Sequence, residues 1–324
     1  MNSNLFNKQH ILYADGSEEL GYGHLMRVLN LSKILKIVDS SIFIFDNLDQ
    51  KNFYELQKVV CINKNNLPKK NYQLLIVDSK VDQTNLIRQF QNSVMKILVI
   101  DNLILKKNLY DFMVLPSFFE NAKDRGVTSS IEEKVFLGSE YLILNPRISD
   151  VQARQKKEFI TISFGGSDPN NLTLFVLTLL KKNIPLNNIL VILGPGYKHD
   201  RSLIEKIVNK KQIINNPKNI YDIFVKSFFV ITAFGVTLQE LFYLGISAGI
   251  VANYKSDFDD YLRIEKYFQS VNERNLFCYL GTLQEINKDM ILKAISTSKN
   301  IMQSSKTNKN YGSGWEVLRN KLLS

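Results

Sequence analysis

The segment of residues 10–35, HILYADGSEELGYGHLMRVLNLSKIL, decides the fold class of this 324-residue chain. Its first six residues form an apolar run that ends in a carboxylate, as a buried parallel strand often does. A glycine-rich loop follows, and apolar side chains then recur at helical spacing: Leu25, Val28, Leu29 and Ile34. A strand, a glycine loop and a helix in this order predict the start of a βαβ unit in a parallel sheet.

The same alternation of strand-like and helix-like segments continues through both halves of the chain. Further strand-like runs lie at 40–46, 72–79, 95–102, 111–117, 159–166, 188–195, 212–216, 228–235 and 247–253. A charged stretch at 145–158, interrupted by Pro146, is typical of a linker. We therefore expect an α/β fold with two doubly wound Rossmann-like domains, 1–148 and 149–324, that face a central cleft.

The C-terminal residues predict one more helix, at about 312–324, within the second domain. Its expected apolar face comprises Trp315, Val317, Leu318 and Leu322.

At or next to the ends of three expected strands in the first half stand Asp15, Asp78 and Asp101. Ligands of doubly wound sheets bind beyond the carboxyl ends of the strands. We therefore expect these three carboxylates to lie on the ligand-binding edge of the first sheet.

Composition narrows the class of protein and of partner. No run of eighteen apolar residues and no signal-peptide pattern occurs, so we expect a cytoplasmic protein without stable membrane insertion. The two cysteines, Cys61 and Cys278, lack metal-site spacing and indicate free thiols. The net charge of +10 favours an anionic partner, but the lysines are scattered, which argues against nucleic acid. The oligomeric state stays open.

The first glycine-rich turn carries one of only three histidines in the chain, at the start of a helix. Gly21 and Gly23 allow unusual backbone angles, and the helix N-terminus presents unpaired N–H groups to an anion. The positive helix end disfavours an imidazolium, so His24 could be held neutral and serve as a general base on water. The alternative is a histidine that caps or packs against the helix.

Two further glycine-rich turns follow strands in the second half. In the turn FGGSDPNN, Gly165 and Gly166 precede Asp168, a residue type that caps helices, and the loop-to-helix pattern suits a phosphate. In the segment ITAFGVTLQE, main-chain amides near Gly235 and Thr237 could hold a diphosphate, and Glu240 could accept hydrogen bonds from a ribose diol. A purely structural role in strand-to-helix connections is the alternative for both turns.

Taken in order, the motifs GxGHxxR, LGxEYxxLxP and GGxDPxN resemble a known enzyme family. They are similar to those of the UDP-2,4-diacetamido-2,4,6-trideoxy-β-L-altropyranose hydrolase of pseudaminic acid biosynthesis, over roughly the first 250 residues. That family is similar in fold to the lipid II glucosaminyltransferase, which has the GT-B architecture. The resemblance implies release of UDP from a UDP-sugar by attack of water at the anomeric carbon, without a metal or another cofactor.

The resemblance also implies roles for individual residues. His24 would be the catalytic histidine, and Asp15 and the loop with Gly21 and Gly23 would hold the sugar. Arg27 and Asp78 would also bind the substrate. In the second domain Gly165, Gly166 and Asp168 would shape the cleft. The diphosphate and the ribose would be held by Gly235, Thr237 and Glu240.

The chain departs from the family pattern around the sugar and the nucleotide. Tyr13 replaces an arginine, Lys80 a tyrosine, Asn102 an aspartate and Val236 a serine, and the expected Asn-Gln pair has only Asn253 or Tyr254 nearby. These departures keep two alternatives open. One is a GT-B glycosyltransferase, in which a basic and apolar patch of the first domain would meet a lipid acceptor, and the other is a nucleotide-sugar binder without catalysis.

Overall fold

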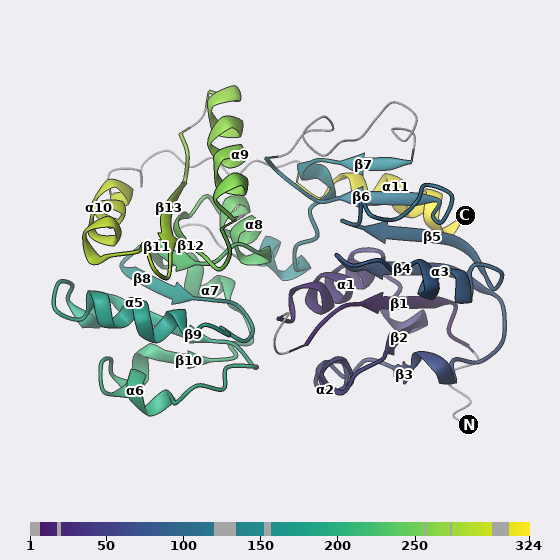
Figure 1. Ribbon diagram of the computed structural model, residues 1–324, viewed down its shortest axis with the longest axis horizontal. Helices are drawn as coiled ribbons and strands as arrows, with labels where there is room; N and C mark the ends of the chain where they lie inside the picture. The colour runs from purple at the N-terminus through teal and green to yellow at the C-terminus, as the bar shows by residue number, and fades with distance from the viewer. Residues whose placement is uncertain are drawn as a thin grey trace. The chain divides into compact units, whose positions relative to one another are not determined.

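The structure is a computed structural model that describes residues 7–17, 21–119, 134–151, 157–255, 257–272, 274–299 and 311–324. The chain forms two compact units, Met1–Pro146 together with Asn310–Ser324, and Arg147–Lys309 (Figure 1). Each unit is built on one parallel β-sheet, which confirms the expected class of two doubly wound α/β domains.

The first sheet has seven strands among the described residues, in the order β3-β2-β1-β4-β5-β6-β7. The strands are β1 (His10–Ala14), β2 (Ser41–Phe45), β3 (Cys61–Asn63), β4 (Tyr72–Asp78), β5 (Val94–Ile100), β6 (Phe112–Leu115) and β7 (Val135–Leu137). The helices of this unit are α1 (Gly23–Ile34), α2 (Leu48–Leu56), α3 (Thr84–Phe90) and α11 (Gly314–Leu323). Short 3₁₀ turns lie at Val38–Ser40, Lys64–Asn66 and Ser139–Tyr141, and another, Pro146–Asp150, lies at the boundary between the units.

The first sheet is buried on both faces because the side chains of each strand alternate. On β1, Leu12 and Ala14 pack into one apolar core with α1, α2 and α11. Ile11 and Tyr13 point to the opposite core, to which α3 contributes. A continuous apolar strand such as β1 is what burial on both faces requires.

The second sheet has six strands among the described residues, in the order β10-β9-β8-β11-β12-β13. The strands are β8 (Phe159–Ser163), β9 (Ile189–Leu193), β10 (Ile213–Asn215), β11 (Ser227–Thr232), β12 (Ser247–Ala252) and β13 (Phe277–Thr282). The helices are α5 (Leu172–Leu180), α6 (Arg201–Glu205), α7 (Tyr221–Phe224), α8 (Val236–Tyr243), α9 (Asp257–Ser270) and α10 (Lys288–Lys299), with 3₁₀ turns at Leu186–Asn188 and Lys210–Gln212.

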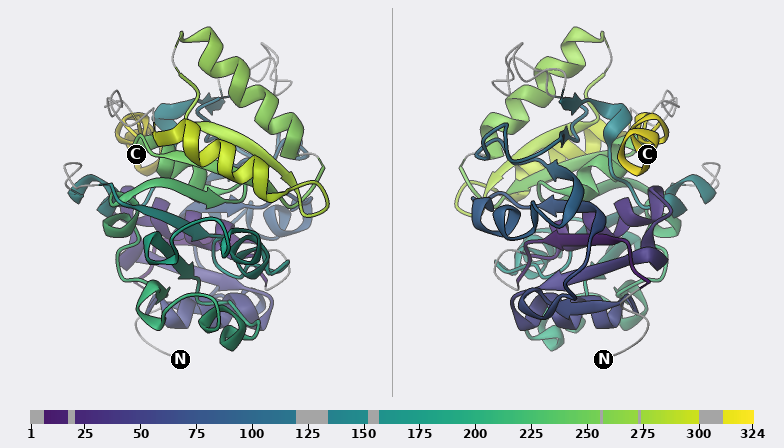
Figure 2. Two further views of the ribbon diagram at one scale, coloured as in Figure 1. Left: turned by 90° about the vertical axis from the view of Figure 1, so that its left-hand side faces the viewer. Right: turned by 90° about the vertical axis from the view of Figure 1, so that its right-hand side faces the viewer.

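The C-terminal helix corrects the expected domain division. We expected it in the second domain, but the described segment 311–324 packs on the first unit, where α11 appears in yellow (Figures 1 and 2). The indole Nε1 of Trp315 donates to the carbonyl of Leu142 at 3.1 Å, and Leu318 and Leu322 enter the core that contains β1. Val317, which we expected on the apolar face, is 61% exposed because it lies off the buried stripe. The boundary between the units falls at Pro146, two residues before the expected position.

Three strands have no counterpart in the sequence-based expectation: β3, β7 and β13. β3 and β7 have three residues each, and all six are half-buried, so they lack the apolar run that marks the central strands. No helix in the described part of the chain is long and apolar enough to cross a membrane.

In each unit, the strand order makes two loops candidates for ligand binding. In the first sheet β1 and β4 are neighbours, but α1, which follows β1, and α3, which follows β4, pack on opposite faces. In the second sheet β8 and β11 are neighbours in the same way. At such a switch point the loops diverge and leave room for a ligand beyond the strand ends.

Candidate functional site

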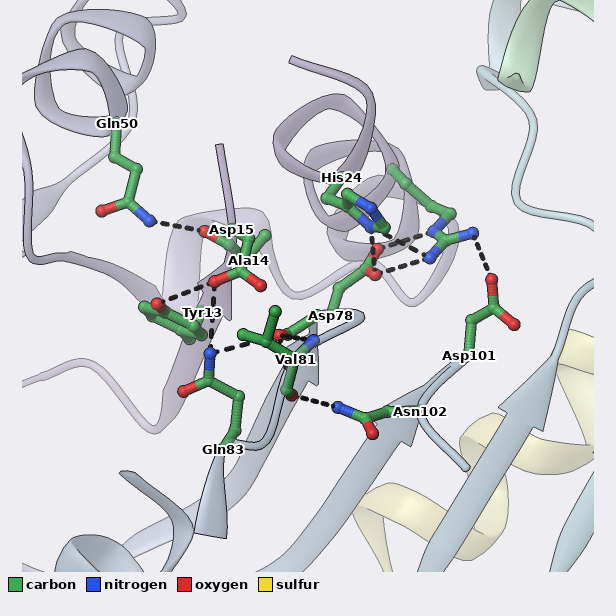
Figure 3. A network of polar contacts seen from close by, with 12 residues as sticks. Tyr13, Ala14, Asp15, His24, Gln50, Asp78, Val81, Gln83, Asp101 and Asn102 are labelled. Carbon is green, nitrogen blue, oxygen red and sulfur yellow. Dashed lines mark hydrogen bonds and ion pairs between the residues drawn. The ribbon is translucent and has the colours of Figure 1, made fainter. Parts of the chain in front are cut away.

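The central group of the first unit is a buried carboxylate at the end of β4. Asp78 has no solvent exposure, and its Oδ1 lies 2.7 Å from Nδ1 of His24 (Figure 3). His24 stands in the first turn of α1, and 21% of its side chain is exposed. The histidine therefore has one side fixed by the protein and another open toward solvent.

Arg27, one turn further along α1, fixes the same carboxylate. Its Nε and Nη2 donate to the two oxygens of Asp78, each at 2.6 Å, while its Nη1 lies 3.6 Å from Oδ2 of Asp101. Two parallel bonds of this kind hold a carboxylate in a defined plane. The expected meeting of Asp78 and Asp101 at one sheet edge is thereby observed, with the guanidinium between them (Figure 3).

These contacts define the charges in the group. Burial by itself would raise the pKa of Asp78, but Arg27 and His24 outweigh it and lower that pKa to about 2. Burial opposes the charge of Arg27, yet Asp78 and Asp101 raise the pKa of the guanidinium above its ordinary value. Asp78 is thus an anion at neutral pH and accepts the Nδ1–H of His24.

This hydrogen bond determines which ring nitrogen is available. With the proton on Nδ1, the lone pair of a neutral imidazole is on Nε2. Within the described residues, the polar contacts of His24 are those of Nδ1 with Asp78 and with Nη2 of Arg27, 3.2 Å away. A guanidinium only donates, so with the proton on Nδ1 the Arg27 contact is an approach without a hydrogen bond. Nε2 is therefore free to take a proton from a water or a hydroxyl group.

The first turn of α1 adds main-chain donors beside the ring. Tyr22 precedes the helix without a side-chain cap, and the first turn contains no acidic residue. Gly21 has φ 79°, a conformation that glycine adopts readily, and a Cβ on Gly23 would meet no atom within 4 Å. In the described part of this loop, therefore, no side chain caps the positive end of α1.

Asp15, at the end of β1, belongs to a second polar group. Its Oδ1 accepts from the Tyr13 hydroxyl at 3.0 Å and from Nε2 of Gln83 at 3.2 Å (Figure 3). The Tyr13 hydroxyl also lies 3.2 Å from a carboxylate oxygen of Asp46. Burial and these two carboxylates raise the pKa of Tyr13, so the phenol remains a neutral donor. Tyr13 therefore contributes a hydrogen bond at the position where the hydrolase family that the sequence resembles carries an arginine.

The turn after β8 differs from the expected phosphate loop. The carboxylate of Asp168, 4% exposed, accepts from the main-chain N–H of Leu172 at 2.8 Å and of Thr173 at 2.9 Å. α5 begins at Leu172, several residues later than the sequence suggests, and these amides are the ones that a bound anion would use. Asp168 therefore occupies the helix end itself, which is a capping role.

The two glycines of this turn face different surroundings. Gly165 is exposed with φ 77°, and the carbonyl of Gly166 accepts from the N–H of Gly196 at 2.8 Å. A Cβ at Gly194 would come within 2.3 Å of the Gly165 carbonyl oxygen, so the loops after β8 and β9 are closely packed.

The turn after β11 retains an open helix end. Gly235 precedes α8 without a side-chain cap, and Thr237 lies half-buried in the first turn. Glu240 is 8% exposed, and its carboxylate accepts a hydrogen bond of 2.6 Å from the Tyr221 hydroxyl, the one side-chain polar contact of Glu240 among the described residues. Burial raises the pKa of Glu240 to about 7, although the bond from Tyr221 lowers it. Tyr221 lies ten positions before the segment ITAFGVTLQE and outside every motif that we identified, and no sequence signal pointed to it.

The structure thus gathers the predicted residues of the first half, Asp15, Gly21, Gly23, His24, Arg27 and Asp78, at one switch point. Those of the second half lie in the turn after β8, in the turn after β11 and in the helix α8 that follows it. Asn170, beside the second turn, donates to the side chain of Asn253 at 3.1 Å, one of the two residues that we compared with the missing Asn-Gln pair. The described residues include no group of three or more His, Cys, Asp or Glu side chains that could hold a metal ion.

Comparisons with known proteins agree with this fold. No protein-family profile matches the chain. The uncharacterized protein MJ1062 of Methanocaldococcus jannaschii is 28% identical over 281 residues, which cover 78% of this chain and 58% of that protein. The spore coat polysaccharide biosynthesis protein SpsG of Bacillus subtilis is 23% identical over 254 residues, covering 72% of this chain and 74% of SpsG. The chain therefore matches little more than half the length of the archaeal relative.

Solved structures with a similar fold include glycosyltransferases and epimerases. The glycotransferase of kitacinnamycin superposes with a TM-score of 0.60 at 9% identity, covering 98% of this chain and 95% of that one. The UDP-GlcNAc 2-epimerase of Neisseria meningitidis, bound to UDP-GlcNAc, gives 0.55 at 14% identity, covering 97% of this chain and 100% of that one. The likeness supports the two-domain GT-B architecture and, at these identities, the fold alone.

Proposed function

We propose that the protein is a nucleotide-sugar hydrolase that releases UDP from a UDP-linked diacetamido-trideoxy sugar, as a step of nonulosonic acid biosynthesis. The observation that carries the proposal is the pairing of His24 with the buried Asp78, which leaves Nε2 without a polar partner among the described residues, at a helix start with no side-chain cap there. The name of SpsG, which refers to polysaccharide biosynthesis, and the UDP-sugar bound to the similar epimerase support the substrate class.

In the proposed reaction, Nε2 of His24 takes a proton from a water molecule as its oxygen attacks the anomeric carbon. The bond between that carbon and the diphosphate oxygen breaks, and its electron pair leaves with UDP. Asp78 stabilises the imidazolium that forms, as the carboxylate of a catalytic triad does. The proton then passes from His24 to solvent.

Arg27 acts in this scheme through Asp78. Its two 2.6 Å bonds hold the carboxylate in place and keep it ionised, so that it accepts the Nδ1–H of His24 in a fixed orientation. Arg27 is therefore a positioning residue in the proposal. This differs from the substrate-binding role that the family resemblance implies.

In the second unit, α8 is the better candidate for the diphosphate because its first-turn amides lack a side-chain cap. The carboxylate of Glu240 is held by one hydrogen bond, from Tyr221, which leaves its second oxygen able to accept from a ribose hydroxyl. The turn with Asp168 is the weaker candidate because its helix end is already occupied.

The test is UDP release from a panel of UDP-sugars by the wild type and by His24→Ala, with UDP binding measured in parallel. Loss of a general base lowers the rate by ~10²–10⁴-fold. We expect release by the wild type, a loss of that size in the variant, and unchanged UDP binding. Equal release by both proteins would contradict the role of His24, and no release from any sugar would contradict the hydrolase.

A GT-B glycosyltransferase is the second candidate, favoured by large aliphatic side chains that are exposed next to Asp101, namely Leu103 and Ile104. In that case Nε2 would take the proton of an acceptor hydroxyl instead of water. Turnover that requires an added acceptor would support the transferase. UDP binding with no turnover under either condition would instead indicate a binder without catalysis.

A further inference from the structure

Two neighbouring loops at the carboxyl edge of the first sheet form a rigid pair. The loop after β4 and the loop after β5 are joined by Asn102, whose Nδ2 donates to the carbonyl of Val81 at 2.8 Å (Figure 3). The Oδ1 of Asn102 accepts from the N–H of Ile104 at 3.2 Å. Asn102 is 1% exposed, and Leu105 anchors its loop in the apolar core that contains Tyr13. The tips of both loops are therefore held in place.

The side chains at these tips are aliphatic and exposed. Val81 is 56% exposed, Leu103 45% and Ile104 62%. Leu103 and Ile104 line a hollow of about 260 Å³ together with Lys80, Asp101 and Asn102. Contiguous exposed apolar surface often marks an interaction site, whereas apolar side chains exposed singly are common and need no explanation. We call Lys80, Val81, Leu103, Ile104, Lys106 and Lys107 the loop patch.

The charge of the loop patch is positive. Lys80, Lys106 and Lys107 are exposed, and the described residues provide none of their ammonium groups with an ion pair or hydrogen bond. Three carboxylates lie on the same loops, and one of them, the exposed Asp111, accepts from the main-chain N–H of Ile97 at 2.8 Å. Asp101 is paired with Arg27, and Asp82 is engaged by the main chain and hydroxyl of Thr84. The exposed cations therefore outnumber the exposed carboxylates.

We propose that the loop patch binds the surface of an anionic lipid membrane and holds the first unit there. Aliphatic tips enter the interface between headgroups and acyl chains, while lysine stems lie along it and keep their ammonium groups among the lipid phosphates. Each lysine near such a surface strengthens binding about fivefold. The patch begins at the strand ends that carry Asp78 and Asp101, so binding brings His24 close to the membrane.

The composition of the patch favours lipid over the other possible occupants. Energetically important positions of protein interfaces are enriched in Trp, Tyr and Arg and depleted in Lys, whereas the loop patch has only aliphatic residues and lysines. The hollow of about 260 Å³ is smaller than the ~300–1,000 Å³ of sites that enclose a whole small ligand. Without a membrane-spanning helix among the described residues, attachment would be peripheral.

The experiment is co-sedimentation of the full chain with vesicles of phosphatidylcholine alone and with added phosphatidylglycerol, at low and physiological salt. The patch variants are Leu103→Ser with Ile104→Ser, and Lys106→Gln with Lys107→Gln. Matched controls are Leu48→Ser with Leu56→Ser, which are 72% and 58% exposed on α2, and Lys181→Gln with Lys182→Gln, exposed in the second unit. Circular dichroism melting verifies that each variant folds.

We expect binding only to the anionic vesicles, weakened by salt, and reduced at least about tenfold by each patch variant but less than twofold by either control. No binding by the wild type, or equal losses in patch and control variants, would overturn the proposal. Self-association that disappears in the patch variants, without vesicle binding, would overturn it in favour of a second copy as the occupant. The readout does not depend on turnover, and His24→Ala should bind vesicles as the wild type does, so failure here is distinct from failure of the hydrolase proposal.

Discussion

Replacing Asp78 by asparagine tests the central group most directly. The change keeps the size of the side chain but removes the charge that accepts from Arg27 and from Nδ1 of His24. In the variant, an NH₂ group replaces one of the two carboxylate oxygens and faces the N–H donors of Arg27. A buried guanidinium loses its main partner, and the imidazole loses the acceptor that fixes its tautomer.

The expected loss of stability follows from the pKa of Asp78. That pKa lies at about 2 instead of 3.8 because Arg27 and His24 outweigh the effect of burial. At ~1.4 kcal/mol for each pH unit, the interactions of the ionised form are worth roughly 2.5 kcal/mol at neutral pH. For a unit of this size each kcal/mol shifts the melting temperature by ~2–4 °C, so Asp78→Asn should melt ~5–10 °C lower.

The pH dependence has a defined sign. Because folding lowers this pKa, the stabilisation is fully present above about pH 4 and is lost as the pH falls toward 2. The difference in melting temperature between the wild type and Asp78→Asn should therefore shrink in that window. The kcat of UDP release should fall by ~10²–10⁴-fold at neutral pH because the tautomer of His24 is no longer fixed.

The assay combines thermal melting from pH 7 to pH 2.5 with UDP release at pH 7, and Asp82→Asn on the same loop is the control. Asp82 is exposed, and an asparagine there keeps the oxygen that caps Thr84, so its effect should stay within ~0.5 kcal/mol. A variant Asp78→Asn that melts like the wild type at pH 7, or that keeps more than half of its activity, would refute the role assigned to Asp78.

Three further sets of substitutions test other parts of the structure. Glu240→Gln should raise the melting temperature at pH 8 but not at pH 4, because folding raises the pKa of Glu240 from 4.5 to about 7 and burial of the ionised form then costs roughly 3 kcal/mol; equal melting shifts at both values would contradict this. Asp168→Ala should cost ~1–3 kcal/mol in chemical unfolding and Asp168→Asn less, since the asparagine keeps one acceptor for the start of α5. Trp315→Ala should cost ~3–5 kcal/mol and Val317→Ala less than ~0.5, because only the tryptophan is buried in the first unit; similar costs in the same unfolding experiment would argue against the placement of α11.

Much of the fold could be read from local patterns. Long apolar runs identified the central strands, such as β1 and β4, because burial on both faces leaves little choice of side chain. The short strands β3 and β7 and the later β13 were missed because half-buried residues give no such run. The meeting of Asp78 and Asp101 also followed from sequence, since the carboxyl ends of parallel strands lie at one edge.

The role of each side chain could not be predicted in this way, because it depends on contacts with residues that are distant in the sequence. A glycine turn followed by an aspartate looks the same whether the aspartate faces a ligand or caps its own helix, and only the main-chain path placed Asp168 on the amides of α5. Likewise, Trp315 joined the first unit because its indole and Leu318 fit a core built from residues far earlier in the chain.

The sequence by itself therefore determined the α/β class, the two-domain plan and the glycine turns at strand ends, because these depend on local periodicity and backbone freedom. Only the tertiary structure decided that Arg27 and His24 share the carboxylate of Asp78, with Nε2 of the histidine left open. That arrangement depends on the packing of α1 against the end of β4, which brings side chains from separate elements within hydrogen-bonding distance, and no local pattern encodes such a distance.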